Sequence, residues 1–98
     1  MAHSVVWSER AIEHINVIGE YISKGSPHDA HAVVERILGV GKRLRQFPFA
    51  GRRVPEAKEH TFREVFVHSD RVIYRTRADA VTIVAVIHVR QRISGDDL

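Results

Sequence analysis

The sequence predicts an α+β fold in which two amphipathic helices pack against an antiparallel sheet. Hydrophobic residues recur at spacings of three and four through the first half of the chain, and the period changes to two after about residue 60. A chain of 98 residues with 44% hydrophobic residues can bury one core but not two. We therefore expect an N-terminal strand, a two-helix hairpin and then a three-stranded antiparallel meander.

The first half is expected to form one short strand and both helices. Residues 4–7 are β-prone, and Ser8 can cap a first helix over residues 8–23. Residues 24–27, Lys-Gly-Ser-Pro, end this helix and start a second one. The apolar spacing of the second helix continues until Pro48 ends it. Because the link is short, the helices should form a hairpin.

The second half is expected to form a loop and the meander. Residues 47–56 combine proline, glycine and charge, which is typical of a loop. Alternating patterns with turn residues between them then predict strands at 61–68, 71–77 and 81–89. The last strand is apolar on both faces, so we expect it to be the middle of the sheet, with the N-terminal strand pairing at one side of the meander.

The whole chain, residues 1–98, is expected to be one domain with a core at about residues 4–93 and a polar tail at 94–98. There is no cysteine, so stability must come from packing. The longest apolar stretch is about half as long as a membrane helix requires. Residues 1–6 lack the pattern of a signal peptide, and a cytoplasmic location is expected.

Arginine dominates the basic residues of the second half, and the formal net charge is +3. Alternation along residues 71–77 places Arg71, Arg75 and Arg77 on one face. If the helices cover the other face, this face looks outward and can bind an acidic ligand, including nucleic acid. Alternatively, the arginine stems only shield strand surface. The full set is Arg52, Arg53, Arg63, Arg71, Arg75, Arg77, Arg90 and Arg92.

His88 lies at the end of the most apolar strand, two residues before Arg90. A histidine can exchange protons near neutral pH, and arginines beside it can stabilise a phosphate, so this is a candidate RNA-cleaving pair. The alternative is a structural histidine that only forms hydrogen bonds. Glu64 and Tyr74 lie on the faces opposite their arginine neighbours, which favours core-edge or ion-pairing roles.

Metal and cofactor sites are not expected. The seven histidines include no H-E-x-x-H pattern, and His28 with His31 is only a spaced pair at a helix start. No glycine-rich phosphate-binding loop occurs. Gly39 and Gly41 lie within the second helix, where we expect them to allow close packing against the first helix.

Several short motifs, in order along nearly the whole chain, resemble the RelE/ParE superfamily of toxins from bacterial type II toxin–antitoxin systems, and most closely its ParE branch. No single motif is diagnostic, but their order and spacing together are specific. They are Trp7-Ser8 before Ala11, Ile18 with Tyr21-Ile22, Pro27 with Ala30, Leu44 with Pro48 and Gly51-Arg52, Pro55-Glu56, Arg63-Glu64, residues 71–75 and residues 86–90.

The resemblance implies a growth-arresting toxin that a cognate antitoxin neutralises by wrapping it, as in plasmid stabilization systems. For ParE-like members the implied target is DNA gyrase. For RelE-like members it is messenger RNA in the ribosome, cut through attack by a ribose 2′-hydroxyl. Arg63 and Arg71 match basic positions of the RelE-like pattern, and His88 lies near its C-terminal catalytic region. However, the chain has no tyrosine after the last strand and no lysine-rich helix end.

Three hypotheses follow. In the first, the protein inhibits DNA gyrase by binding it, without a cofactor, and Arg63, Arg71, Arg75 and Arg90 contact the target. In the second, it is a ribosome-dependent endoribonuclease, with Arg63, Arg71 and His88 as catalytic candidates. In the third, a toxin-like fold has lost toxicity and survives as a binding partner.

Overall fold

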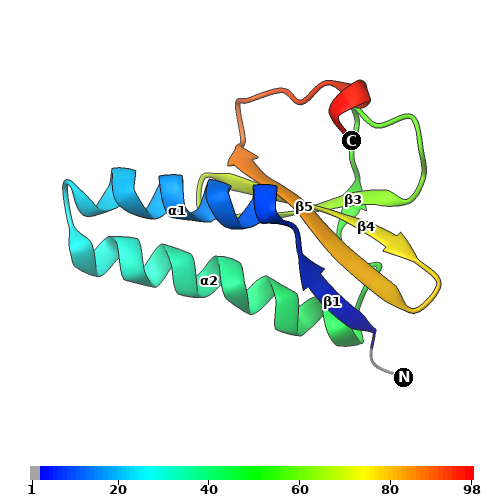
Figure 1. The fold of residues 1–98 in the computed structure, drawn as a ribbon, viewed down its shortest axis with the longest axis horizontal. Helices are drawn as coiled ribbons and strands as arrows, with labels where there is room; N and C mark the ends of the chain where they lie inside the picture. The colour runs from blue at the N-terminus through cyan, green and yellow to red at the C-terminus, as the bar shows by residue number, and fades with distance from the viewer. Residues whose placement is uncertain (1–2) are drawn as a thin grey trace.

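The computed structural model describes residues 3–98 and confirms the predicted order of a strand, two helices and a meander (Figure 1). Met1 and Ala2, which the expected domain includes, lie outside the described residues. The elements are β1 (Ser4–Trp7), α1 (Glu9–Ser23), α2 (Pro27–Gln46), β2 (Arg52–Arg53), β3 (Phe62–Val67), β4 (Asp70–Arg77), β5 (Ala80–His88) and the short 3-10 helix η1 (Gly95–Asp97).

The predicted helix starts are confirmed by their caps. The hydroxyl of Ser8 accepts the backbone N–H of Ala11 at 3.1 Å, and the hydroxyl of Ser26 accepts that of Asp29 at 3.1 Å. Each cap satisfies a donor that has no partner within its helix. Pro27 occupies the first turn of α2, where its missing N–H costs nothing. The two helices run side by side as a hairpin whose turn projects beyond the sheet (Figure 1).

The sheet order is β1-β5-β4-β3-β2, so two expectations need correction. First, residues 52–53 form strand β2 inside the segment expected to be a loop, because they pair with residues 63–64 of β3. Second, the middle strand is β4 and not β5. The reason is that β1 adds to β5 in parallel at one edge while β2 adds to β3 at the other. β5 is nevertheless covered on both faces, as expected.

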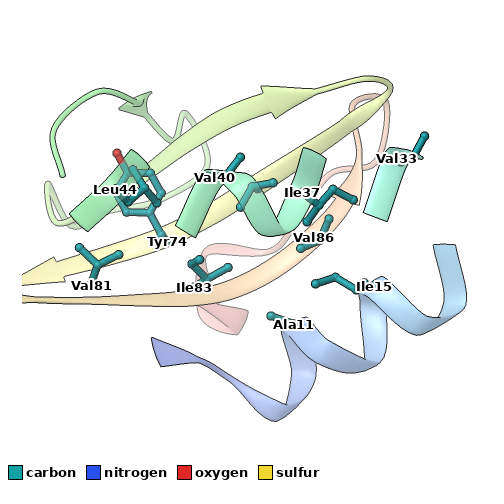
Figure 2. Packing of buried hydrophobic residues seen from close by; sticks show 11 residues of the cluster. Ala11, Ile15, Val33, Ile37, Val40, Leu44, Tyr74, Val81, Ile83 and Val86 are labelled. Carbon is teal, nitrogen blue, oxygen red and sulfur yellow. The ribbon is translucent and has the colours of Figure 1, made fainter. Parts of the chain in front are cut away.

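The main core lies between the helical hairpin and one face of the sheet. Tyr74, Ile37 and Leu44 are almost completely buried there, and each such side chain contributes about 1.5–3 kcal/mol of burial free energy. Figure 2 shows helix side chains facing those of the strands, namely Ala11, Ile15, Val33, Ile37, Val40, Leu44, Tyr74, Val81, Ile83 and Val86. The helices therefore cover this face.

The glycines of α2 do not have the expected role. A Cβ at Gly41 would lie 3.1 Å from the ring of Trp7, so Gly41 allows α2 to approach β1 and not α1. A Cβ at Gly39 would meet nothing within 4 Å. The expectation of close packing between the helices at these glycines is wrong, because Trp7 of β1 occupies the space beside Gly41.

A second, smaller core covers the opposite face of the sheet. An irregularity between β4 and β5, where Ile73 pairs with Ala85 and Tyr74 with Ile83, leaves Val84 without a partner in β4, and both Val84 and Ala85 contact this core. The segment after β5 packs here through Ile93, and Leu98 is half-buried against it. Residues 94–98, expected to be a polar tail, thus include the short helix η1 with Ser94 as its cap.

Candidate functional site

Four charged residues form one ionic cluster on the second face of the sheet, which we call the Arg71 cluster: Arg52, Glu56, Glu64 and Arg71. The Nε of Arg71 donates to Glu64 at 2.7 Å, and its two Nη atoms donate to the two oxygens of Glu56 at 2.8 Å each. Arg52 donates to the other oxygen of Glu64 at 2.7 Å. Arg71 also donates to the backbone oxygen of Gln91 at 2.9 Å, so four of its N–H groups have partners.

Glu56, Glu64 and Arg71 of the Arg71 cluster are mostly buried, whereas Arg52 lies at its exposed edge. The side chain of Arg71 is 6% exposed, and that of Glu64 is fully buried. The hydrogen bonds from Arg71 lower the pKa of Glu56 to about 2, and the bonds to Glu56 and Glu64 raise the pKa of Arg71. The expectation that Arg71 faces outward is wrong, because the segment after β5 and two carboxylates enclose it. The expectation that Glu64 forms ion pairs is confirmed.

Arg63, which is expected to contact the target, and its neighbour Arg52 are more accessible than Arg71. The guanidinium of Arg63 lies 5.2 Å from the centroid of the exposed Phe49 ring and donates to the oxygen of Gly51 at 2.8 Å. Arg52 lies 5.0 Å from the exposed Phe66 ring, and 60% of its side chain remains exposed. These pairs hold each guanidinium over an aromatic face, the geometry of a cation–π contact.

Arg75 is ion-paired and partly buried, whereas Arg90 is exposed. Arg75 donates to Glu59 at 2.9 Å and lies 5.1 Å from the Phe62 ring, with 27% of its side chain exposed. Arg90 is exposed, as is His88, and the backbone N–H of Arg90 donates to the Nδ1 of His88 at 3.1 Å. Among residues 3–98, no hydrogen bond or ion pair joins His88 to Arg63 or Arg71. The three catalytic candidates therefore share no polar contact.

The lining residues of one concave feature, beside α1, were not identified from the sequence. A groove of about 540 Å³, which we call the α1 groove, lies where the β3–β4 turn and the end of β5 run beside α1 (Figure 1). Val17 and Tyr21 on its rim are 59% and 76% exposed. Their spacing of four on α1, outside the buried stripe, is the signal that could have revealed it. The lining residues are His14, Val17, Ile18, Tyr21, Ile22, His68, Ser69, Asp70, Val86, Ile87, His88 and Gln91.

Two titratable groups of the α1 groove have shifted pKa values. Asp70 is 6% exposed, and its burial raises the pKa of the carboxyl group, although nearby His68 and His88 oppose this. The Nδ1 of His14 accepts the backbone N–H of Val86 at 3.0 Å. Burial, together with the charge of Arg10, lowers the pKa of His14, so its ring is neutral at pH 7. His14 thus satisfies a backbone donor of β5 beyond the end of β1.

Within residues 3–98, no three His, Asp or Glu side chains come together in a way that could hold a metal ion. In the same part of the chain, no helix is long and apolar enough to cross a membrane.

Comparison with known proteins identifies relatives over almost the full chain. Residues 5–93 match the family model described as the ParE toxin of the type II toxin–antitoxin system, parDE. The chain is 32% identical over 89 residues to the protein Y4kP of Sinorhizobium fredii, which is named as a candidate toxin; the match covers 88% of each chain.

Two solved structures share the fold. One is from a chromosomal ParDE system of P. aeruginosa, with a TM-score of 0.74 and 20% identity over 91% of this chain and 98% of that one. The other is from the RelBE2 toxin–antitoxin complex of Mycobacterium tuberculosis, with a TM-score of 0.63 and 18% identity over 90% of this chain and 99% of that one. At these identities the structures confirm the α+β fold alone.

Proposed function

This chain belongs to the ParE toxin family of type II toxin–antitoxin systems, and we propose that it arrests growth by binding DNA gyrase and not by cutting RNA. The burial of Arg71 is the observation that carries this proposal. A ribonuclease of the RelE type needs basic groups that can reach a phosphate as negative charge develops on it. Arg71 matches one such basic position, but two carboxylates already neutralise it.

Freeing Arg71 for a phosphate would leave Glu56 without its cation and Glu64 paired with Arg52 alone. Breaking a buried ion pair costs about 3–5 kcal/mol because it leaves an uncompensated charge. The remaining RNA-cleaving groups are equally limited. The two tyrosines are Tyr21 and Tyr74, and Tyr74 is fully buried with its hydroxyl accepting the N–H of Gly51 at 3.0 Å. Neither follows the last strand.

A protein target is favoured by the exposed aromatic and arginine side chains around β2 and β3. Phe47, Phe49 and Phe66 are 61%, 62% and 48% exposed. Arginine and aromatic side chains, including phenylalanine, are enriched at protein interfaces. In this proposal Arg63 contacts gyrase beside Phe49, Arg75 and Arg90 add further contacts, and Arg71 supports the surface from inside without touching the target.

The proposal includes a cognate antitoxin that neutralises the protein, in keeping with the toxin–antitoxin systems named for its structural relatives. It also includes a cytoplasmic site of action, because gyrase acts on DNA there, and a role in plasmid stabilization when the pair is carried on a plasmid.

An experiment in cells tests the target. We expect that expression of the protein without antitoxin relaxes plasmid DNA within the time of growth arrest while messenger RNA stays intact. The variant His88→Ala should arrest growth as strongly as the parent. Cleaved messages with unchanged plasmid supercoiling, and loss of arrest in a folded His88→Ala protein, would instead support the ribonuclease hypothesis, which the exposure of His88 beside Arg90 favours.

A further inference from the structure

We infer that the α1 groove binds a segment of the antitoxin that presents one lysine or arginine among apolar side chains, and that Asp70 binds this cation. The inference rests on the proposed antitoxin partnership and adds to it the residue and the chemistry of recognition.

Asp70 is the first reason for this inference. Its side chain is part of the groove lining, yet the residue is only 6% exposed. None of the ion pairs or side-chain hydrogen bonds found within residues 3–98 involves its carboxylate. Burial of the residue raises the pKa of this carboxylate, which means that its charged form is disfavoured in the isolated toxin. A cation that enters the groove and pairs with Asp70 would stabilise the charged carboxylate.

The walls of the α1 groove are the second reason. Val17, Ile18 and Ile22 of α1 and Val86 of β5 supply apolar side chains to its lining. A volume of about 540 Å³ lies within the range of about 300–1,000 Å³ that is usual for ligand pockets. Apolar walls around a single charge select a segment whose own charge is flanked by apolar residues, which is how an amphipathic helix binds in a groove.

The charges that line the groove make a cation the matching group. Asp70 is the only carboxylate among the lining residues, and no lysine or arginine lines the groove. The other titratable groups there are His14, His68, His88 and Tyr21, and His14 is neutral at pH 7. A nucleic-acid phosphate would meet a carboxylate and apolar walls. The groove therefore favours a positively charged peptide over a polyanion.

Binding measurements with the protein encoded by the gene adjacent to this toxin test the inference. Asp70→Asn keeps the shape of the side chain and removes its charge. Asp79→Asn is the matched control, because it changes the net charge equally at an exposed turn outside the groove. We expect Asp70→Asn to raise the Kd at least tenfold and Asp79→Asn to change it less than twofold. Equal Kd values for Asp70→Asn and the parent would overturn the inference.

A second measurement identifies the cation. Each lysine and arginine of the antitoxin is changed to glutamine and titrated against both the parent toxin and Asp70→Asn. One substitution should weaken binding to the parent at least tenfold and leave binding to Asp70→Asn unchanged. If every substitution weakens both toxins equally, Asp70 has no cationic partner and the inference is wrong. If the parent toxin does not bind the antitoxin at all, the partnership itself fails, whereas gyrase inhibition is judged by a separate assay.

Discussion

The guanidinium of Arg71 forms two parallel hydrogen bonds of 2.8 Å to the carboxylate of Glu56, fifteen residues away in the chain. The same carboxylate accepts the backbone N–H of Ile93 at 3.4 Å, and Arg71 donates to the oxygen of Gln91. One ion pair thus joins the loop after β2, the central strand β4 and the segment after β5. It fixes the C-terminal segment against the sheet and removes Arg71 from the surface.

Glu56→Gln should lower the free energy of unfolding by about 3 kcal/mol, because it leaves the buried Arg71 with an incomplete set of partners. Glu59→Gln is the matched control: its pair with Arg75 is exposed, with 58% of the Glu59 side chain accessible, and should contribute less than about 1 kcal/mol. Urea unfolding measures both. Equal losses for the two variants would contradict the central role of the Arg71–Glu56 pair.

Acid should weaken the fold through the same carboxylate. The pKa of Glu56 falls from 4.5 to about 2 in the folded protein, so the unfolded chain binds the proton more readily. The resulting stability is present above about pH 4.5 and is lost as the pH falls toward 2. Urea unfolding at several pH values should show this slope in the parent protein. In Glu56→Gln the free energy of unfolding should depend less steeply on pH between 4.5 and 2. An unchanged dependence would mean that other carboxyl groups cause it.

Asp70→Asn should raise the free energy of unfolding at pH 7 by about 1 kcal/mol, since it removes a charge that burial disfavours. The sign follows from the raised pKa of Asp70: the folded state holds the proton more tightly, so stability falls as the pH rises above 3.8. The gain should vanish below pH 3.8. When protonated, His68 and His88 attract the carboxylate, which reduces the stability gained by Asp70→Asn in acid. His14 lines the same groove.

Thermal and urea unfolding of Asp70→Asn at pH 7 and pH 3.5 check this prediction. A loss of stability at pH 7 would mean that the carboxylate has a stabilising partner in the isolated toxin. That result would also count against the binding of a cation in the α1 groove.

Two glycine substitutions should act in opposite directions. A Cβ at Gly51 would lie 2.5 Å from the backbone oxygen of Glu64 and 2.8 Å from the hydroxyl of Tyr74, so Gly51→Ala should cost more than about 2 kcal/mol. Gly39 lies inside α2 with open space around it, and Gly39→Ala should stabilise the protein by about 0.5–1 kcal/mol. Chemical unfolding of both variants tests the close approach at Gly51; a stable Gly51→Ala protein would contradict it.

The elements that the sequence predicted correctly depend on neighbours in the chain. Ser8 and Ser26 cap helices whose first residues follow them directly, and the alternation along β4 correctly separates Tyr74 from its arginine neighbours. The features that were missed depend on distant pairings. Strand β2 exists because Arg52 pairs with Glu64, and the α1 groove forms because α1 meets the β3–β4 turn about fifty residues later in the chain.

The candidate site was predictable only in part for the same reason. Alternation placed Arg71 on the face opposite the helices, which is correct, but no local pattern indicates that Glu56 and the segment around Ile93 cover that face. A period of two reports which side a residue is on and not what packs against it.

Supercoiling by purified DNA gyrase in the presence of antitoxin-free protein is the decisive measurement of whether this toxin inhibits gyrase. We expect inhibition at near-stoichiometric amounts of the protein, with reduced inhibition by Arg63→Ala and reversal when the antitoxin is added. Unimpaired supercoiling by gyrase, in the presence of folded protein that arrests growth and cleaves messages on the ribosome, would contradict it.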